Sequence, residues 1–422
     1  MRRKSWLTHL LALGALTITA AHAQEAKPAR YHVIDLGTLG GTYSYSYGIS
    51  ATGVVAGGAA TEDQTDQLSQ TAFLSNGWHK VPIGTIDGAS CPTCSSEAGG
   101  PNIWGEAPVI SETANFDPNG EDFCGFGTHR QCLAAVWRSG TLKVLPVLEG
   151  GHNSQAYWNN DLGEVVGFSE TGTPDSNCLA AYQRYRYVAV KWEPRGGVRI
   201  LRPLDGDTVS FAFTNNEKGE VVGISGLCSN TSLPPNSNPG GPHAVLWDRS
   251  GTPHDLGALP GAIGSNVAGN INDLGHVAGT SVLSDGTVHT FLWTKTAGMK
   301  DIGTPPGAFV TVAPCCNSLN NKDEITGFAV DADGPFGFVW KGGQFTDLNT
   351  EIPAGSPWYI LNTASINDAG QIAATGLNTE TGEVHAVLLK PIPRIGAPGA
   401  KGMLNRPPLP FRVRQMMDKK RD

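Results

Sequence analysis

The sequence predicts an all-β fold, a seven-bladed β-propeller with four-stranded blades, from three observations. Glycine supplies 54 and proline 28 of the 422 residues. Long helices are therefore unfavourable, since Gly costs about 1 kcal/mol and Pro about 3 kcal/mol inside a helix. Three short patterns recur in fixed order seven times within residues 31–390. Recurrence at this spacing is typical of β-propellers. Finally, the array lacks one strand at its end and has an additional strand at its beginning.

The first pattern in each unit is a tight turn between two short strands, clearest as Asn-Asp-Leu-Gly at 272–275. Asn, Asp or Ser at the first position accepts a backbone hydrogen bond, and Gly at the fourth supplies the positive φ of a bulged hairpin. We expect these turns at 50–53, 117–120, 160–163, 216–219, 272–275, 320–323 and 367–370.

The other two patterns are strands. One usually ends in tryptophan, as at 243–247, and the other contains Asp-Leu-Gly or a relative of it, as at 255–257. Together the three patterns give about four short strands per unit, which is one propeller blade. A blade is too small to bury its own faces, so the tryptophans are expected to fill the space between neighbouring blades.

The ends of the array predict a closed ring. Residues 31–36 form a strand that precedes the first turn, and no Asp-Leu-Gly strand follows 387–389. The N-terminal strand would complete the last blade and remove the sheet edges that an open array leaves exposed. An open β-solenoid is the competing interpretation, and it predicts polar capping repeats instead.

The repeat resembles the HAF-repeat family of extracellular repeat proteins, which is named for a His-Ala-Phe strand. The corresponding strand begins His-Ala-Val at 243–245 and 385–387 and His-Thr-Phe at 289–291. Asp-Leu-Gly-Thr-Leu-Gly-Gly stands at 35–41, and Ile-Asn-Asp-x-Gly at 271–275. The resemblance covers nearly all of residues 31–390. It implies an extracellular repeat protein and transfers no enzymatic role.

Both ends of the chain differ from the repeats. Residues 1–23 have a basic start, an apolar run and an Ala-His-Ala site, which predicts a signal peptide cleaved after Ala23 and a secreted or periplasmic protein. The apolar run is too short to span a membrane, and no later segment is apolar enough. Residues 24–30 are a short linker. The tail, 391–422, carries eight Lys or Arg and two Asp, contains several prolines, and is expected to be disordered.

The long connections between strands predict which face binds a ligand, because binding residues on rigid scaffolds lie mostly in loops. They are expected at 58–70, 87–110, 170–187 and 226–242, all on the face opposite the tight turns. Neutral elaboration of the surface is the alternative. Aromatic and cationic side chains there suit a carbohydrate or an anionic ligand, or they cover a strand. The candidate binding residues are Trp104, His129, His152, Tyr182, Arg184, Tyr185, Asp207, Trp358 and Tyr359.

Eight cysteines in an exported chain favour disulfides. The expected pairs are Cys91 with Cys94, Cys124 with Cys132, Cys178 with Cys228, and Cys315 with Cys316. No metal site is expected, because His243, His289 and His385 occupy the same position in different blades and should point in different directions. No cofactor is expected either.

Two functions remain open from the sequence. The first is an exported, non-catalytic binding scaffold, a monomer that recognises an extracellular glycan or protein; the acidic body disfavours nucleic acid. The alternative is a propeller hydrolase or lyase that acts on an extracellular polysaccharide. Its chemistry would fall to residues gathered at the channel mouth: Glu97, His129, His152, Asp175 and Asp207. Two carboxylates about 5–9 Å apart would favour this alternative.

Overall fold

The computed structural model describes residues 29–64, 69–179, 183–231, 243–393 and 406, and within these ranges the fold is all-β. The predicted signal peptide, Tyr182 and most of the tail lie outside the described residues. The helical turns of the described part are short: α1 (Cys228–Thr231), η1 (Gly88–Ser90) and η2 (Leu348–Thr350). None of its helices is long and apolar enough to cross a bilayer.

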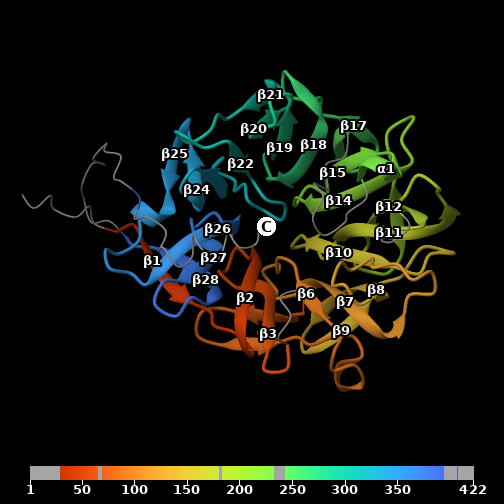
Figure 1. Ribbon diagram of the computed structural model, residues 1–422. Helices are drawn as coiled ribbons and strands as arrows, with labels where there is room; N and C mark the ends of the chain where they lie inside the picture. The colour runs from red at the N-terminus through yellow and green to blue at the C-terminus, as the bar shows by residue number, and fades with distance from the viewer. Residues whose placement is uncertain (1–28, 65–68, 180–182, 232–242, 394–405, 407–422) are drawn as a thin grey trace, which may run out of the picture.

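The described strands pair antiparallel in groups of four that follow one another around a ring (Figure 1). At two places a single parallel residue pair, Tyr43 with Val384 and Val288 with Val310, joins neighbouring groups into one sheet. The first three groups are β2 (Gly40–Ile49), β3 (Val55–Thr61), β4 (Thr71–Ser75) and β5 (Lys80–Pro82); β6 (Ser96–Ala98), β7 (Ala107–Phe116), β8 (Arg130–Arg138) and β9 (Thr141–Val144); and β10 (Ser154–Asn159), β11 (Val165–Pro174), β12 (Tyr185–Trp192) and β13 (Val198–Leu201).

The later groups repeat this order. They are β14 (Val209–Asn215), β15 (Val221–Gly226), β16 (His243–Trp247) and β17 (Pro253–Asp255); β18 (Ala262–Ile271), β19 (Val277–Leu283), β20 (Val288–Thr294) and β21 (Gly298–Asp301); β22 (Val310–Val312), β23 (Ile325–Asp331), β24 (Gly334–Lys341) and β25 (Gln344–Asp347); and β26 (Trp358–Ile366), β27 (Ile372–Asn378) and β28 (Val384–Pro391) with β1 (Tyr31–Asp35).

The first and last strands of the ring are neighbours. Strand β1 pairs antiparallel with β28, in a register that runs from Tyr31 opposite Pro391 to Asp35 opposite Val387. At the end of this ladder the Nδ1 atom of His385 lies 2.9 Å from a carboxylate oxygen of Asp35. The all-β prediction and the pairing of the N-terminal strand with the last strand are therefore confirmed.

The predicted turns join the first and second strands of their groups, with one correction. The turn at 117–120 was predicted to occupy this place in the second group, but it follows β7 and belongs to the long β7–β8 connection. The equivalent turn is 102–106, in which the Asn102 side chain accepts the Glu106 N–H at 3.0 Å. The expected loop 87–110 therefore contains β6 and the start of β7. In another copy Asp323 adopts a φ of 54°, where the others use glycine.

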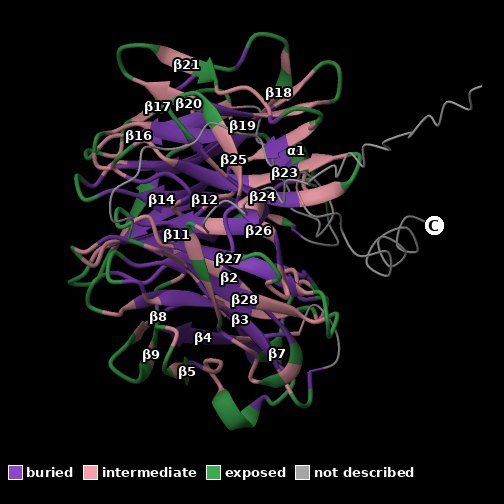
Figure 2. Ribbon diagram, turned by 90° about the vertical axis from the view of Figure 1, so that its left-hand side faces the viewer, coloured by how far each residue is buried: buried purple, intermediate pink, exposed green. Residues whose placement is uncertain are grey.

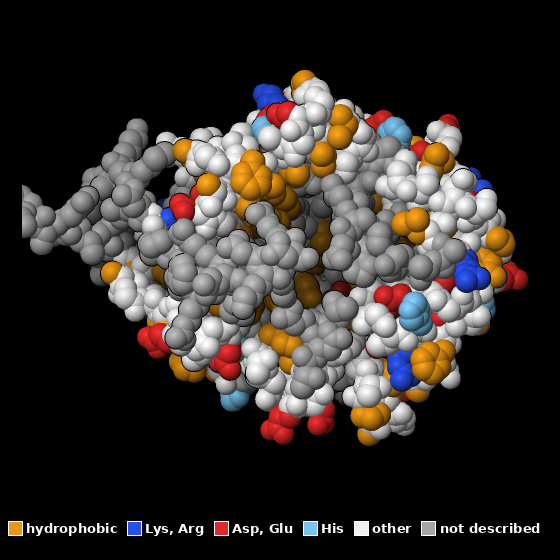
Figure 3. All heavy atoms as spheres, viewed as in Figure 1, with side chains coloured by type: hydrophobic (Ala, Val, Ile, Leu, Met, Phe, Trp, Pro, Cys, Tyr) orange, Lys and Arg blue, Asp and Glu red, His pale blue; other side chains and the backbone are white. Residues whose placement is uncertain are grey.

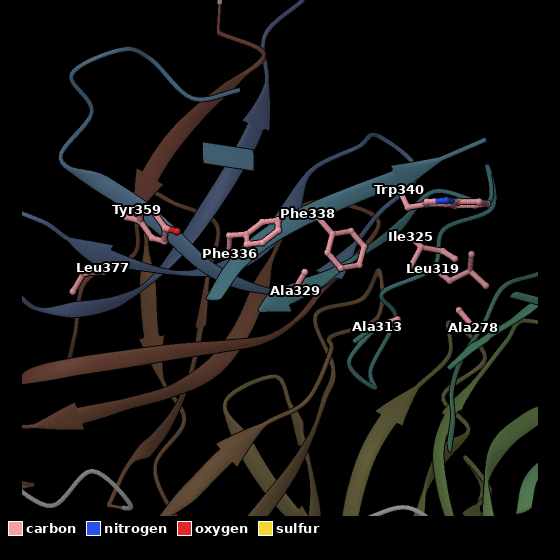
Figure 4. Packing of buried hydrophobic residues seen from close by; sticks show 10 residues of the cluster. All are labelled: Ala278, Ala313, Leu319, Ile325, Ala329, Phe336, Phe338, Trp340, Tyr359 and Leu377. Carbon is pink, nitrogen blue, oxygen red and sulfur yellow. The ribbon is translucent and has the colours of Figure 1, made fainter. Parts of the chain in front are cut away.

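Hydrophobic side chains fill the space between neighbouring groups of strands. Trp192 and Trp247 are almost fully buried, and their indole N–H groups donate to backbone carbonyls of the preceding group, at Pro146 (2.8 Å) and Arg202 (2.7 Å). Figure 4 shows another such cluster, in which Phe338, Trp340 and their neighbours from three groups lie close together. Buried strands make up the interior, and exposed connections lie at its periphery (Figure 2).

A ring of asparagine side chains links the turns around the central channel. Each donates from Nδ2 to the backbone carbonyl of the corresponding residue in the next group, at 3.0–3.3 Å. We call these six residues the asparagine ring: Asn102, Asn160, Asn216, Asn272, Asn320 and Asn367. The last hydrogen bond of the series, from Asn367 to the Ser50 carbonyl at 3.0 Å, joins the last group of strands to the first.

The asparagine ring predicts a stability effect at Asn216. Its Nδ2 donates to Glu220 and to the Asn272 carbonyl, and its Oδ1 accepts two backbone N–H groups. We expect Asn216→Ala to lower the free energy of unfolding by roughly 1–3 kcal/mol, because it leaves buried polar groups unpaired. Asn216→Asp should be at least as harmful, since it places a carboxylate against Glu220. Urea unfolding measures both changes.

The exposed Asn115 offers the matched control, and Asn115→Ala should change stability by less than about 0.5 kcal/mol. Equal effects at the two positions would contradict a stabilising role for the asparagine ring.

Candidate functional site

The channel through the ring has two different ends. At the end with the tight turns, a cavity of about 240 Å³ is lined by most of the asparagine ring and by the residues that follow its members, Asp161, Glu217, Asp273, Asn321 and Asp368. Four of these five residues are acidic, and the side chain of each accepts a backbone N–H from the preceding group, for example Glu217 from Asp161 at 2.8 Å and Asp273 from Glu217 at 2.9 Å. Burial, and then the neighbouring carboxylates, raise the pKa of Glu217. These acidic groups are held by the scaffold, so their role is structural.

Side chains from several groups of strands converge around Glu97. Tyr47 (β2), Glu97 (β6) and Tyr157 (β10) are half-buried, in strands whose neighbouring side chains are fully buried. Tyr157 lies within electrostatic reach of Glu97, Tyr47, Cys315 and Cys316. The two cysteines come from the β22–β23 connection on another part of the ring. Alternation along the innermost strands thus directs one set of side chains into the channel.

Glu97 is the titratable group at the centre of this convergence. Gln70 donates from Nε2 to the Glu97 carboxylate at 2.8 Å and to the Tyr47 hydroxyl at 3.0 Å. Burial raises the pKa of Glu97 to about 7, against the opposing effect of hydrogen bonds from Tyr47 and Gln70. Burial also raises the pKa of the Tyr47 and Tyr157 phenols, so both remain protonated. Glu97 can therefore gain or lose a proton near neutral pH.

Aromatic rings stiffen the wall around Glu97. Tyr157 meets Phe211 and Phe213 edge to face, with ring centroids 5.0 and 5.9 Å apart. Phe211 in turn stacks on Phe168 at 4.1 Å. Such pairs resist rearrangement because each ring is held on more than one side. Figure 3 shows the molecule hollowed at the centre of the ring, with hydrophobic side chains on the walls of the hollow.

The cysteines follow the predicted pairing in three of four cases. The sulfur atoms of Cys91 and Cys94, of Cys124 and Cys132, and of Cys178 and Cys228 lie at disulfide distance, and the last pair joins the connections of neighbouring groups. The predicted Cys315–Cys316 bond is absent, since these sulfurs are 2.8 Å apart and both thiols are free. Bridging adjacent cysteines would strain the peptide between them. The contact with Cys315, followed by burial, raises the pKa of the Cys316 thiol.

A cluster of buried carboxylates lies on the opposite face from the tight turns, within the long connections. The amide of Asn153 donates to Asp117 at 2.7 Å, to Glu170 at 3.1 Å and to Glu121 at 3.4 Å. Burial raises the pKa of Glu170 to about 9, and the Glu121 carboxylate beside it adds to the increase. Burial likewise raises the pKa of Glu121 and of Glu112. At neutral pH the Glu121–Glu170 pair therefore shares a proton.

Four candidate residues predicted from the sequence, His152, Tyr185, Arg184 and Asp175, lie beside this cluster. The backbone N–H of His152 donates to Glu170 at 3.0 Å, and its ring meets Tyr185 edge to face at 6.2 Å. The backbone N–H of Arg184 donates to Glu121. Asp175, predicted for the catalytic alternative, is buried nearby and paired with Arg186 at 3.2 Å. The face predicted to carry recognition thus holds a coherent group of polar residues.

The remaining candidates are dispersed. Trp104 was expected in a long connection of the binding face, but it lies on the tight-turn face, where its indole donates to the Asp161 carbonyl at 3.0 Å. Trp358 and Tyr359 were expected in a loop and belong to β26 instead; Tyr359 is buried, and its hydroxyl donates to the Pro335 carbonyl. His129 is exposed.

Asp207 accepts from the Ser225 hydroxyl at 2.6 Å and lies 4.0 Å from His243. Sequence reasoning missed Tyr47, Tyr157 and the Glu121–Glu170 pair. The inward alternation of the innermost strands is the signal that points to the two tyrosines. Within the part of the chain that the structure describes, no three His, Cys, Asp or Glu side chains are arranged to hold a metal ion.

Comparison with known proteins yields structural likeness only. No family model and no curated protein matches the sequence. Among solved structures, a puromycin hydrolase is 12% identical with a TM-score of 0.48, covering 88% of this chain and 58% of its own. This chain thus spans little more than half of that enzyme.

Two lyases match over nearly their whole length. An oligogalacturonate lyase in complex with manganese is 12% identical (TM-score 0.48, covering 87% of this chain and 97% of its own). A streptogramin B lyase is 11% identical (TM-score 0.45, covering 86% and 98%). These likenesses assign neither a substrate nor a reaction to the present chain.

The buried carboxylate cluster predicts how stability depends on pH. Between about pH 4.5 and 9 the native Glu170 keeps a proton that the unfolded chain releases, so the free energy of unfolding falls as pH rises through this range. We expect Glu170→Gln to flatten this decline and to stabilise the protein by roughly 1–3 kcal/mol at pH 8, because the amide keeps a donor towards Glu121 and folding no longer requires the uptake of a proton. Urea unfolding at a series of pH values measures both effects.

Glu149 is exposed and provides the control. Glu149→Gln should leave the pH profile of stability unchanged. If the Glu170→Gln profile runs parallel to that of the wild type, Glu170 does not hold the proton.

Proposed function

We propose that the protein is an exported seven-bladed β-propeller that binds an extracellular glycan in its central channel without transforming it. The seven groups of four strands and the β1–β28 pairing support the closed propeller. Three cysteine pairs at disulfide distance agree with an oxidising compartment outside the cytoplasm. Membership of the HAF-repeat family, cleavage after Ala23 and a monomeric state remain predictions from the sequence.

The convergence of Tyr47, Glu97 and Tyr157 carries the binding proposal. Saccharides present closely spaced hydroxyl groups on one side and apolar C–H faces on the other. Glu97, Gln70 and the Tyr47 hydroxyl are linked by hydrogen bonds of 2.8 and 3.0 Å, so donors and acceptors lie side by side. The Tyr157 ring offers a flat apolar surface next to them. A few fixed polar groups in an aromatic-lined hollow are the usual composition of a small-molecule site.

A second function is favoured by one specific observation, the pKa of Glu97 near 7. A carboxyl group with this pKa suits general acid–base catalysis at neutral pH, as a hydrolase or lyase of an extracellular polysaccharide requires. The other close carboxylate pair argues for binding alone. Glu121 and Glu170 contact the same amide and are both buried, whereas glycosidic chemistry uses carboxylates about 5–9 Å apart with substrate between them.

A panel of immobilised extracellular polysaccharides and peptidoglycan, assayed for retention and for released fragments, separates the two functions. We expect the mature protein to be retained by at least one polymer and to release no fragments. Glu97→Gln should weaken retention about 10- to 100-fold, because it removes a charged hydrogen-bond acceptor. Glu149→Gln is the control and should bind like the wild type.

Release of fragments that Glu97→Gln abolishes while retention persists would establish the enzyme instead. Failure of every polymer to retain the protein would refute the glycan proposal.

Binding should also depend on pH through Glu97. A ligand hydroxyl donates best to the ionised carboxylate, which predominates above the pKa of about 7. Affinity for a retained glycan is therefore expected to fall about tenfold for each pH unit below 7, and Glu97→Gln should remove this dependence. Titration calorimetry from pH 5 to 8 measures it. Unchanged wild-type affinity across this range would place the ligand away from Glu97.

A further inference from the structure

One residue of the basic tail, Arg406, lies in a socket on the propeller. The socket is formed by the β23–β24 turn, the end of β25 and the start of β26, and its residues are Asp331, Asp333, Phe336, Asp347 and Tyr359. Only 12% of the Arg406 side chain is exposed. Figure 4 shows Phe336 and Tyr359 close to each other at this place.

The guanidinium makes both polar and aromatic contacts. Its Nη2 atom donates to both carboxylate oxygens of Asp331, at 2.7 and 2.8 Å. A carboxylate oxygen of Asp347 lies 3.8 Å from Nη1 of Arg406, and one of Asp333 lies 4.0 Å from Nη2. The Arg406 Cζ atom stands 4.2 Å from the centroid of the Phe336 ring. A planar cation that is stacked on a ring and hydrogen-bonded at its edge is the arrangement that arginine provides and lysine does not.

The charges of the socket favour an added cation. Three carboxylates gather within about one side-chain length of each other, and Asp331 and Asp347 are largely buried. Like charges this close repel one another, and burial increases the cost of keeping each ionised. The ion pairs that Asp331 and Asp347 make in this structure come from Arg406. The propeller surface is therefore complementary to one arginine.

We propose that this socket is a specific arginine-binding site and that its occupant is the chain's own C-terminal segment, held by Arg406. The chain is long enough for this arrangement: the propeller ends with β28 at Pro391, and Arg406 stands 15 positions further along the chain. Fifteen residues span up to about 50 Å when extended, more than the radius of a propeller of this size. The socket shares no residue with the proposed glycan site.

The test uses the full-length mature protein and an arginine-specific dicarbonyl reagent, with modification of each arginine followed by mass spectrometry. Arg412 and Arg414 of the same tail are the internal references. We expect Arg406 to be modified at least about tenfold more slowly than these references, since a docked guanidinium cannot react. Asp331→Asn should remove most of this protection. Phe336→Leu, which keeps the apolar contact but not the aromatic face, should reduce it about threefold or more.

Thermal unfolding checks that each variant folds. If Asp331→Asn does not fold, the reactivity of Arg406 in Phe336→Leu tests the proposal. Equal reactivity of Arg406 and Arg414 in the wild type would overturn the proposal. Protection that persists in both variants would show that another part of the molecule covers Arg406. Protection that grows with protein concentration would show that the arginine comes from a second copy, and it would overturn the intramolecular assignment.

Discussion

The pairing of β1 with β28 is the constraint on which the rest of the structure depends. An array of small sheets buries its faces only against neighbours, so the first and last members of an open array would each expose one face. Joining Tyr31–Asp35 to Val384–Pro391 places the two ends of the chain in one sheet. Asn367 makes the same connection on the inner side, through its bond to the Ser50 carbonyl. The junction between the first and last groups of strands is therefore held by the β1–β28 pairing and by the Asn367 hydrogen bond together.

Much of this architecture can be predicted from the sequence because short-range interactions within the turns determine it. The turn asparagines and the following glycines fix backbone geometry within four residues, and this geometry needs no knowledge of distant contacts. The error at 117–120 shows the limit of such reasoning, because that segment also satisfies turn chemistry. The spacing Asn-x-x-Gly-Glu at 102–106, shared with 160–164 and 216–220, identifies the correct copy. In each of these turns the glutamate at the fifth position accepts a hydrogen bond from the asparagine side chain at the first.

The site was less predictable because its members come from segments without a period. Glu121 belongs to the β7–β8 connection and Glu170 to β11 of the next group, and only the fold brings both to Asn153. Glu97 appeared in the sequence as one acid among many, whereas its burial and its contact with Gln70 depend on two neighbouring groups of strands. Trp358 and Tyr359 are the opposite case, because the sequence predicted a binding role for them and the fold places them in a strand. Their aromatic character suited a ligand, but the fold uses Tyr359 inside a hydrophobic cluster.

The two ends of the channel show how the same chemical groups take different roles. At the tight-turn end each carboxylate accepts a backbone N–H from the preceding group, so its hydrogen-bonding capacity is used by the scaffold. The hydrogen bonds described for the Glu97 carboxylate come from the side chains of Gln70 and Tyr47, and its pKa lies near neutrality. Side-chain donors can rotate away to admit a ligand, whereas backbone donors fixed in a sheet cannot. An exchange of hydrogen-bond partners at Glu97 therefore requires no change in the pairing of the strands.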